Sequence, residues 1–291
     1  MAYDNLGIDL SRTYGFGFDD YDTARLPKLP EEDQKKWYSK FYYQGRPVLS
    51  EQQKRVFAKG NTMDPKDALL PGAFDLLAQQ EEIENDLGYC LLENGVGYGS
   101  AHAVMHGVTM EKFEWYKKLR MVDQLSYQIW YPGSHYSELN GIAIEDIGFG
   151  NCNFHMLSLL DPEMLGFTVR PSEMDPRFAC IMGANSVIKN RDYPQIRPIA
   201  SALFHYVRTM DDGSLDFRTH FFMGGMIVDG KLVRIQKIDP DVCLEITRQM
   251  LSHCCHERVN VENVLPELYE RRAEFDISAA ETMQADMRIM R

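Results

Sequence analysis

The stretch that decides the fold is DVCLEITRQMLSHCCHERVNVENVLPELY, residues 241–269, near the end of a chain of 291 residues. Asp239 and Pro240 precede it, and Asp at a cap with Pro in the first turn is typical of a helix start. At about 100° per residue, six side chains fall within about 60° of Ile246. They are Met250, His253, Glu257, Val261, Val264 and Leu268. This pattern predicts one long amphipathic helix.

Two polar residues, His253 and Glu257, lie one turn apart in the middle of that apolar stripe. Both side chains should therefore point in the same direction, toward the interior. A buried carboxylate is costly unless a positive group meets it. A protonated histidine could meet it, and so could a divalent metal ion bound by both side chains. The spacing alone leaves these two interpretations open.

Composition and charge narrow the function class. Hydrophobic residues make up 44% and charged residues 25%, as in ordinary globular proteins, and the formal net charge is -12. So acidic a chain is a poor candidate for binding nucleic acid or an anionic membrane. It has no apolar run long enough to span a bilayer and no hydrophobic signal core, so we expect a cytoplasmic protein. The six cysteines are scattered, which predicts free thiols and no thiolate zinc site.

The order of predicted elements is helical segments, then antiparallel strands with hairpin turns, then the long helix. An antiparallel sheet needs one face covered, and the terminal helix is the natural cover. The expected fold class is therefore α+β, a helix-grip with a cavity between helix and sheet. Expected helices are 31–43, 50–59, 64–86 and 109–121. Expected strands are 89–93, 96–104, 125–131, 141–149, 152–160, 179–188, 199–209 and 215–228. Asn94-Gly95 predicts a hairpin turn between the first two strands, and Thr109 is a suitable N-cap for the helix 109–121.

The chain divides into a small, mainly helical N-terminal region, 1–86, and a helix-grip domain, 87–291. The first 60 residues are rich in Tyr, Phe and Trp, with prolines at 27, 30 and 47. So many large rings favour an arm that packs over other parts of the molecule.

Further polar residues fall at strand positions whose neighbours are apolar. His205 shares a face with Leu203 and Val207, and Tyr127 alternates with Leu125 and Ile129. Each could equally be an ordinary core residue.

Glu145 and Asp146 occupy opposite faces of one strand, and both faces are apolar, so alternation does not decide which carboxylate turns inward. His135 follows Pro132-Gly133-Ser134 at a strand end, where a surface histidine is also typical. Two imidazoles and two carboxylates would saturate a zinc ion: His135, Glu145, His253 and Glu257. A mixed nitrogen and oxygen set also suits Mn²⁺ or Fe²⁺.

Five motifs in order resemble a known family, the 2,4-diacetylphloroglucinol hydrolases and phloretin hydrolases. They are SYQIWYPGSHY (126–136), IEDIG (144–148), FHYVR (204–208), HCCHE (253–257) and LPELY (265–269). GYC (88–90) and NGVGY (94–98) also resemble the segment with which the sheet of that family begins. The resemblance spans about residues 88–269.

The resemblance implies a zinc-dependent hydrolase that cleaves the carbon–carbon bond between an aromatic polyphenol ring and an acyl group. It also implies a Bet v 1-like helix-grip core, a smaller N-terminal domain and a homodimer. By position, one zinc ion per chain would be held by His135, Glu145, His253 and Glu257. Tyr127 and His205 would contact the substrate and transfer a proton.

Two features depart from the family pattern. Residues 115–120, WYKKLR, stand where the family is richer in Trp and ends in His, and the link from His135 to Glu145 is short. Both changes bear on the shape of the substrate pocket. The alternatives are a non-catalytic helix-grip carrier of a small apolar ligand and a different lyase or cyclase on the same fold.

Overall fold

The computed structural model describes residues 23, 26–45, 47–78, 83, 86–135, 137–139, 142–145, 152–169, 178–190 and 198–282. At 137–139, 142–145, 152–156, 178–182 and 189–190 the description covers the backbone only.

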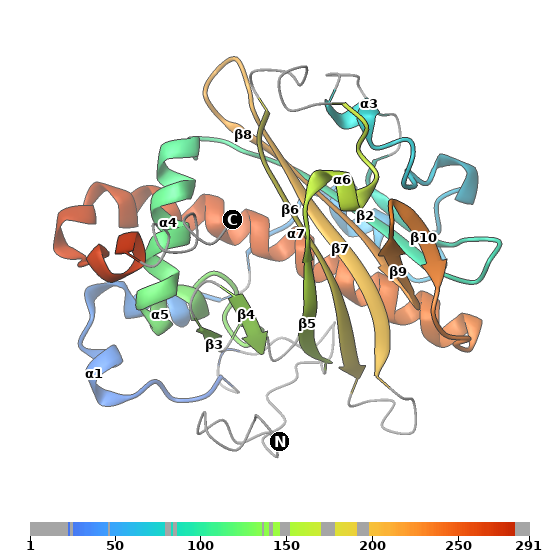
Figure 1. Cartoon of the computed structure of the whole chain (residues 1–291). Helices are drawn as coiled ribbons and strands as arrows, with labels where there is room; N and C mark the ends of the chain where they lie inside the picture. Colours follow the sequence, from blue (N-terminus) through green and yellow to red (C-terminus); the bar gives the residue numbers. More distant parts are fainter. Residues whose placement is uncertain are drawn as a thin grey trace.

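Six strands form one antiparallel sheet in the described part of the chain, in the order β1-β2-β8-β7-β6-β5 (Figure 1). They are β1 (Gly88–Leu91), β2 (Gly97–Met105), β5 (Cys152–Leu160), β6 (Phe178–Asn190), β7 (Ile199–Thr209) and β8 (Leu215–Met223). Two smaller hairpins pair β3 (Ser137–Leu139) with β4 (Ile142–Glu145) and β9 (Gly225–Val228) with β10 (Lys231–Arg234). The predicted hairpin turn at Asn94-Gly95 joins β1 to β2, and Gly95 has the positive φ of +79° that favours glycine.

The long helix α7 (Pro240–Glu270) crosses one face of this sheet, over β1, β2 and β8 (Figure 1). Its N-cap is Asp239, whose carboxylate accepts hydrogen bonds from the backbone N–H groups of Asp241 and Val242. Helix and sheet are in tight contact at Gly97, where a Cβ atom would lie 2.1 Å from Thr247 Oγ1. The predicted terminal helix and its N-terminal start are confirmed.

Side chains alternate between the two faces of the sheet. On β8, Phe217 and Phe221 pack with residues of α7, whereas Phe222 packs on the opposite face. That opposite face is covered by Phe74 and Leu77, beside and within α3, and by Leu165 of α6. The sheet is therefore buried on both sides, and His205 of β7, paired with Thr219, shares the α7 face.

The remaining helices are short apart from α4. They are α1 (Glu31–Gln34), η2 (Trp37–Tyr42), α2 (Glu51–Val56), η3 (Pro65–Asp67), α3 (Asp75–Ala78), α4 (Met110–Val122), α5 (Gln124–Gln128), α6 (Pro162–Leu165) and η5 (Arg272–Glu274). The aromatic arm packs as expected within the described residues: Tyr38 and Phe41 join the cluster that contains the end of α7. Thr109 caps α4, as predicted.

The predicted strand 125–131 is wrong, because its first half is helix α5. Asp123 caps this helix, and its carboxylate accepts the backbone N–H of Ser126. Alternating apolar residues are typical of a strand, but in so short a segment the N-cap favours a helical backbone conformation.

Three further elements differ from the prediction. Residues 31–43 form two separate short elements, α1 and η2, instead of one helix. In 64–86 the described residues contain only η3 and α3, and Gly72, with φ +96°, follows Pro71 in a turn between them. Residues 215–228 form two strands, since Gly224 with φ +84° separates β8 from β9. The coarse expectation of an α+β fold with an antiparallel sheet and a long C-terminal helix is confirmed. Among the described helices, none combines the length and apolar character that crossing a membrane requires.

Candidate metal centre

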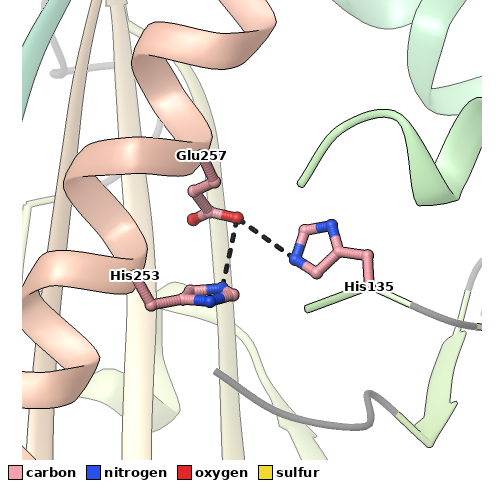
Figure 2. A group of neighbouring side chains, drawn as sticks. All are labelled: His135, His253 and Glu257. Carbon is pink, nitrogen blue, oxygen red and sulfur yellow. Dashed lines mark ion pairs between the residues drawn. The ribbon is translucent and has the colours of Figure 1, made fainter. Parts of the chain in front are cut away.

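Three of the four predicted ligands meet beside the middle of α7. His253 and Glu257 extend from consecutive turns of the helix, and His135 faces them from the loop after α5 (Figure 2). Glu257 Oε2 lies 3.5 Å from His135 Nε2 and 3.6 Å from His253 Nε2. Three potential ligand atoms, one from each residue, lie within 4.8 Å of one another, and all three residues are buried.

The side chain of His253 is oriented by a second group. Its Nδ1 lies 3.0 Å from the hydroxyl of Ser134, within hydrogen-bond distance. When Nδ1–H donates to that oxygen, the lone pair on Nε2 faces Glu257 and His135. A ligand histidine is usually oriented in this way by a partner on its other ring nitrogen.

His135 is positioned by its own loop and by α7. The backbone N–H of His135 donates to the carbonyl of Tyr131 at 3.0 Å, and Gly133 has φ +79°, a conformation that favours glycine. The amide of Asn260, one turn beyond Glu257, donates to the carbonyls of Ile129 and Trp130 at 2.6 and 2.8 Å. α7 therefore carries two candidate ligands and also anchors the loop that carries the third.

The donor set fits a divalent ion. Atoms bound at about 2.0–2.1 Å to a tetrahedral zinc ion lie about 3.4 Å apart, close to the separations around Glu257 Oε2. Burial lowers the pKa of His135 well below its ordinary value, more strongly than the Glu257 charge raises it. Neutral imidazole and ionised carboxylate are the states in which these groups bind metal.

Arg258 keeps the Glu257 carboxylate ionised. Burial by itself would raise the pKa of Glu257, but the guanidinium of Arg258 and the contact with His253 lower it below its ordinary range. Arg258 Nη2 lies 2.8 Å from Glu257 Oε1, which leaves Oε2 directed toward the two histidines.

The two residues predicted to act on the substrate lie beside this cluster. The ring of Tyr127 on α5 stacks on His135, with centroids 4.7 Å apart and planes 3° from parallel. His205 is half-buried on β7, and its Nδ1 lies 3.4 Å from Arg258 Nη2. Burial and Arg258 lower the pKa of His205 to about 3, so its imidazole is neutral at neutral pH.

The fourth predicted ligand, Glu145, is the last residue of β4, and its side chain lies outside the described part of the chain, as does the whole of Asp146. The backbone of Glu145 pairs with Ser137 of β3, two residues after His135. The choice between Glu145 and Asp146 as a ligand therefore stays a prediction.

Sequence reasoning missed several residues that shape the site: Ser134, Thr219, Arg258 and Asn260. One signal was available for Arg258, which directly follows the buried Glu257 and could supply its counter-charge. Thr219 and Asn260 are ordinary polar residues in sequence, and only tertiary contacts reveal their partners.

Two comparisons with known proteins match most of the chain. The model of the DAPG hydrolase PhiG domain family matches residues 71–141 and 139–270. The two segments meet inside the short link between His135 and Glu145. Phloretin hydrolase from Eubacterium ramulus is 24% identical over 272 residues, spanning 83% of this chain and 92% of the relative.

The family match contains His135, His253 and Glu257, together with Tyr127 and His205. It covers well over half of the chain, and it confirms the resemblance on which the expectation of a hydrolase rested. The chain belongs to the DAPG hydrolase PhiG domain family.

Proposed function

We propose that this hydrolase cleaves the carbon–carbon bond between a polyphenol ring and an acyl group, with acylphloroglucinols or phloretin-like ketones as substrates and zinc as cofactor. The observation that carries the proposal is the buried cluster of His135, His253 and Glu257 inside the matched family region. The names of the family and of the Eubacterium relative support the substrate class.

The proposed ligand set for one zinc ion per chain is His135, His253, Glu257 and Glu145. The position of β4 supports the last member, since its pairing with β3 keeps the end of the strand next to the loop of His135. A zinc ion held there would polarise the acyl carbonyl or acidify a water molecule. The nitrogen and oxygen donor set also suits Mn²⁺ and Fe²⁺.

The leaving group of such a reaction is a ring carbon, which must gain a proton before it departs. Tyr127 stacks on His135 and would contact the ring or one of its hydroxyl groups. His205, whose imidazole is neutral at neutral pH, would pass its proton to the ring carbon and regain one from the water that attacks the acyl carbon, so that the imidazole ends neutral. Acid–base residues of this kind contribute about 10²–10⁴-fold to the rate.

The test combines metal analysis with product analysis. Purified protein should contain about one zinc per chain by elemental analysis, and incubation with phloretin or a monoacylated phloroglucinol should release a free carboxylic acid. Glu257→Gln should remove the metal and the activity together. His205→Ala should retain the metal and lose about 10²–10⁴-fold in kcat.

A matched control is His220→Gln, because His220 lies on the opposite face of β8, hydrogen-bonded to Tyr98. Metal-free protein that binds phloretin without turnover would favour a carrier instead. An acyl product other than a free acid would indicate a different lyase.

The same proposal includes a Bet v 1-like helix-grip core and a homodimer. The helix α7 across an antiparallel sheet supports the first. The second is tested by light scattering after size-exclusion chromatography, in which a monomer mass would exclude the dimer.

A further inference from the structure

Arg258 joins the candidate metal cluster to His205. It follows Glu257 on α7 and is 2% exposed. Its Nη2 lies 2.8 Å from Glu257 Oε1, 3.4 Å from His205 Nδ1 and 3.5 Å from Thr219 Oγ1. One nitrogen therefore contacts a candidate metal ligand, Glu257, and also the proposed proton carrier, His205.

A contribution to folding stability does not explain why an arginine is buried at this position. Its Nε and Nη1 are buried without a hydrogen-bond partner among the described residues. The guanidinium carbon lies 3.7 Å from the ring centroid of Phe217 and 5.7 Å from that of Trp130. An apolar side chain could fill such an aromatic site without burying unmet N–H donors, which cost free energy. Its contacts with Glu257 and His205 give a better reason for an arginine at position 258.

The contacts at His205 determine which ring nitrogen carries its proton. Arginine has N–H donors and no acceptor, so the lone pair of Nδ1 must face Nη2. Thr219 Oγ1 lies 2.9 Å from the same Nδ1 and can donate its hydrogen there while accepting an N–H from Arg258. The opposite tautomer would point Nδ1–H at an N–H of Arg258. The proton therefore sits on Nε2.

We propose that Arg258 is a positioning residue that holds His205 in the tautomer protonated on Nε2, with Thr219 as a second donor to Nδ1. Both hydrogen bonds of His205 within the described part of the chain use Nδ1, which leaves Nε2–H for the substrate. The tautomer follows from geometry, and only its catalytic meaning rests on the proposed function.

The direct test is nuclear magnetic resonance of zinc-loaded protein labelled with ¹⁵N at histidine. Long-range proton–nitrogen correlations distinguish the two neutral tautomers and the imidazolium, and loss of one signal set in His205→Asn assigns His205. Wild-type His205 should show the Nε2–H form throughout about pH 5–8, the range in which an ordinary histidine titrates. An Nδ1–H tautomer or an imidazolium at neutral pH would overturn the proposal.

Variants separate Arg258 from Thr219. In Arg258→Met, Thr219 is free to turn and accept from Nδ1, so a mixture of tautomers is expected. Arg258→Lys keeps a cationic donor and should retain the Nε2–H form. Thr219→Val leaves Arg258 in place and should also retain it. If Thr219→Val releases the tautomer and Arg258→Met does not, Arg258 is not the positioning residue.

The matched control is Arg248→Met, which removes another buried arginine from α7. Arg248 binds Glu245 and the carbonyl of Phe57. Its loss should leave the His205 spectrum unchanged. Should Arg258→Met fail to fold, Arg258→Gln replaces it, because an amide can accept from Nδ1–H as well as donate to Nδ1 and should also give a mixture of tautomers.

Kinetics then test the catalytic meaning. With equal zinc content, Arg258→Met should lower kcat by about 10- to 100-fold with little change in KM, and Arg258→Lys should recover part of it. Absence of any turnover in wild-type protein would refute the proposed function and leave the tautomer result standing. Turnover with the wrong tautomer would refute only the role of Arg258.

Discussion

At the scale of single residues, the orientation of His253 depends on a hydroxyl from another part of the chain. Ser134 belongs to the same loop as His135, so one loop supplies both a candidate ligand and the group that orients a second ligand. Without that partner the imidazole could rotate, and its Nε2 would spend less time facing Glu257.

We therefore expect Ser134→Ala to weaken zinc binding by about 10- to 100-fold, measured by competition with a chromophoric chelator. Ser252→Ala is the matched control, because Ser252 hydrogen-bonds His256 on the same helix, outside the cluster. Equal zinc affinity in Ser134→Ala and wild type would show that packing alone orients His253.

At the scale of elements, α7 and the segment after α5 act as one unit. The two hydrogen bonds from Asn260 fix the end of α5 to the helix, and His135 follows five residues later. The separation between His135 and Glu257 thus depends on an anchor that binds no metal itself.

Asn260→Ala should lose about 1–3 kcal/mol of stability, because two buried carbonyl groups lose their donor, and zinc affinity should fall as well. Asp239→Ala, which removes the N-cap of the same helix, should lose about 1 kcal/mol and keep its zinc affinity. Urea unfolding and chelator competition measure both quantities. Parallel losses of zinc affinity in the two variants would contradict the anchor.

A cluster of ion pairs lies on the face of β2 and β8 opposite α7. His102 Nε2 lies 2.7 Å from Asp216, its Nδ1 lies 3.4 Å from Asp86, and Arg218 binds both carboxylates. Burial opposes protonation of His102, but the two carboxylates outweigh it and raise its pKa to about 9. The ion pairs tie Asp86, two residues before β1, to the middle of the sheet.

A pKa raised on folding stabilises the protein only while the group is protonated. The contribution of His102 is therefore complete below about pH 6.5 and is lost as the pH rises through about 9. We expect wild-type stability to fall relative to His102→Gln by about 2 kcal/mol over that interval. Urea denaturation of both proteins at several pH values measures the difference, and parallel curves would show that folding does not raise the pKa of His102.

At the scale of the whole molecule, a glycine allows α7 to lie close against β2 of the sheet. A Cβ atom at Gly97 would lie 2.1 Å from Thr247 Oγ1 and 3.1 Å from Cys243 Sγ. Any larger residue would push the helix outward at this point and shift its side chains relative to β7 and β8.

Gly97→Ala should therefore destabilise the protein by about 1–3 kcal/mol through overpacking. The double variant with Thr247→Ala should recover part of that loss, since the clashing oxygen is removed. The coupling is measured in a double-mutant cycle of thermal or urea unfolding. Additive losses would mean that the helix moves freely at Gly97.

The sequence by itself determined the elements with strong periodicity. The stripe from Ile246 to Leu268 and the Asp239 cap were sufficient for α7, and Asn94-Gly95 was sufficient for the first hairpin. Helical spacing also placed His253 and Glu257 together, because residues four apart share a face whatever the rest of the chain does. These local rules depend only on residues close together in the sequence and not on contacts with distant elements.

The tertiary structure alone decided which distant groups meet. Residues 125–131 alternate like a strand, yet the Asp123 cap and the anchor from Asn260 make the segment a helix and a loop. From the motif resemblance we predict that His135 meets α7. Its distance from Glu257 and the contact of Arg258 with His205, however, depend on packing between elements far apart in sequence. No periodicity encodes such contacts, because they arise only when helix, loop and sheet exclude water together.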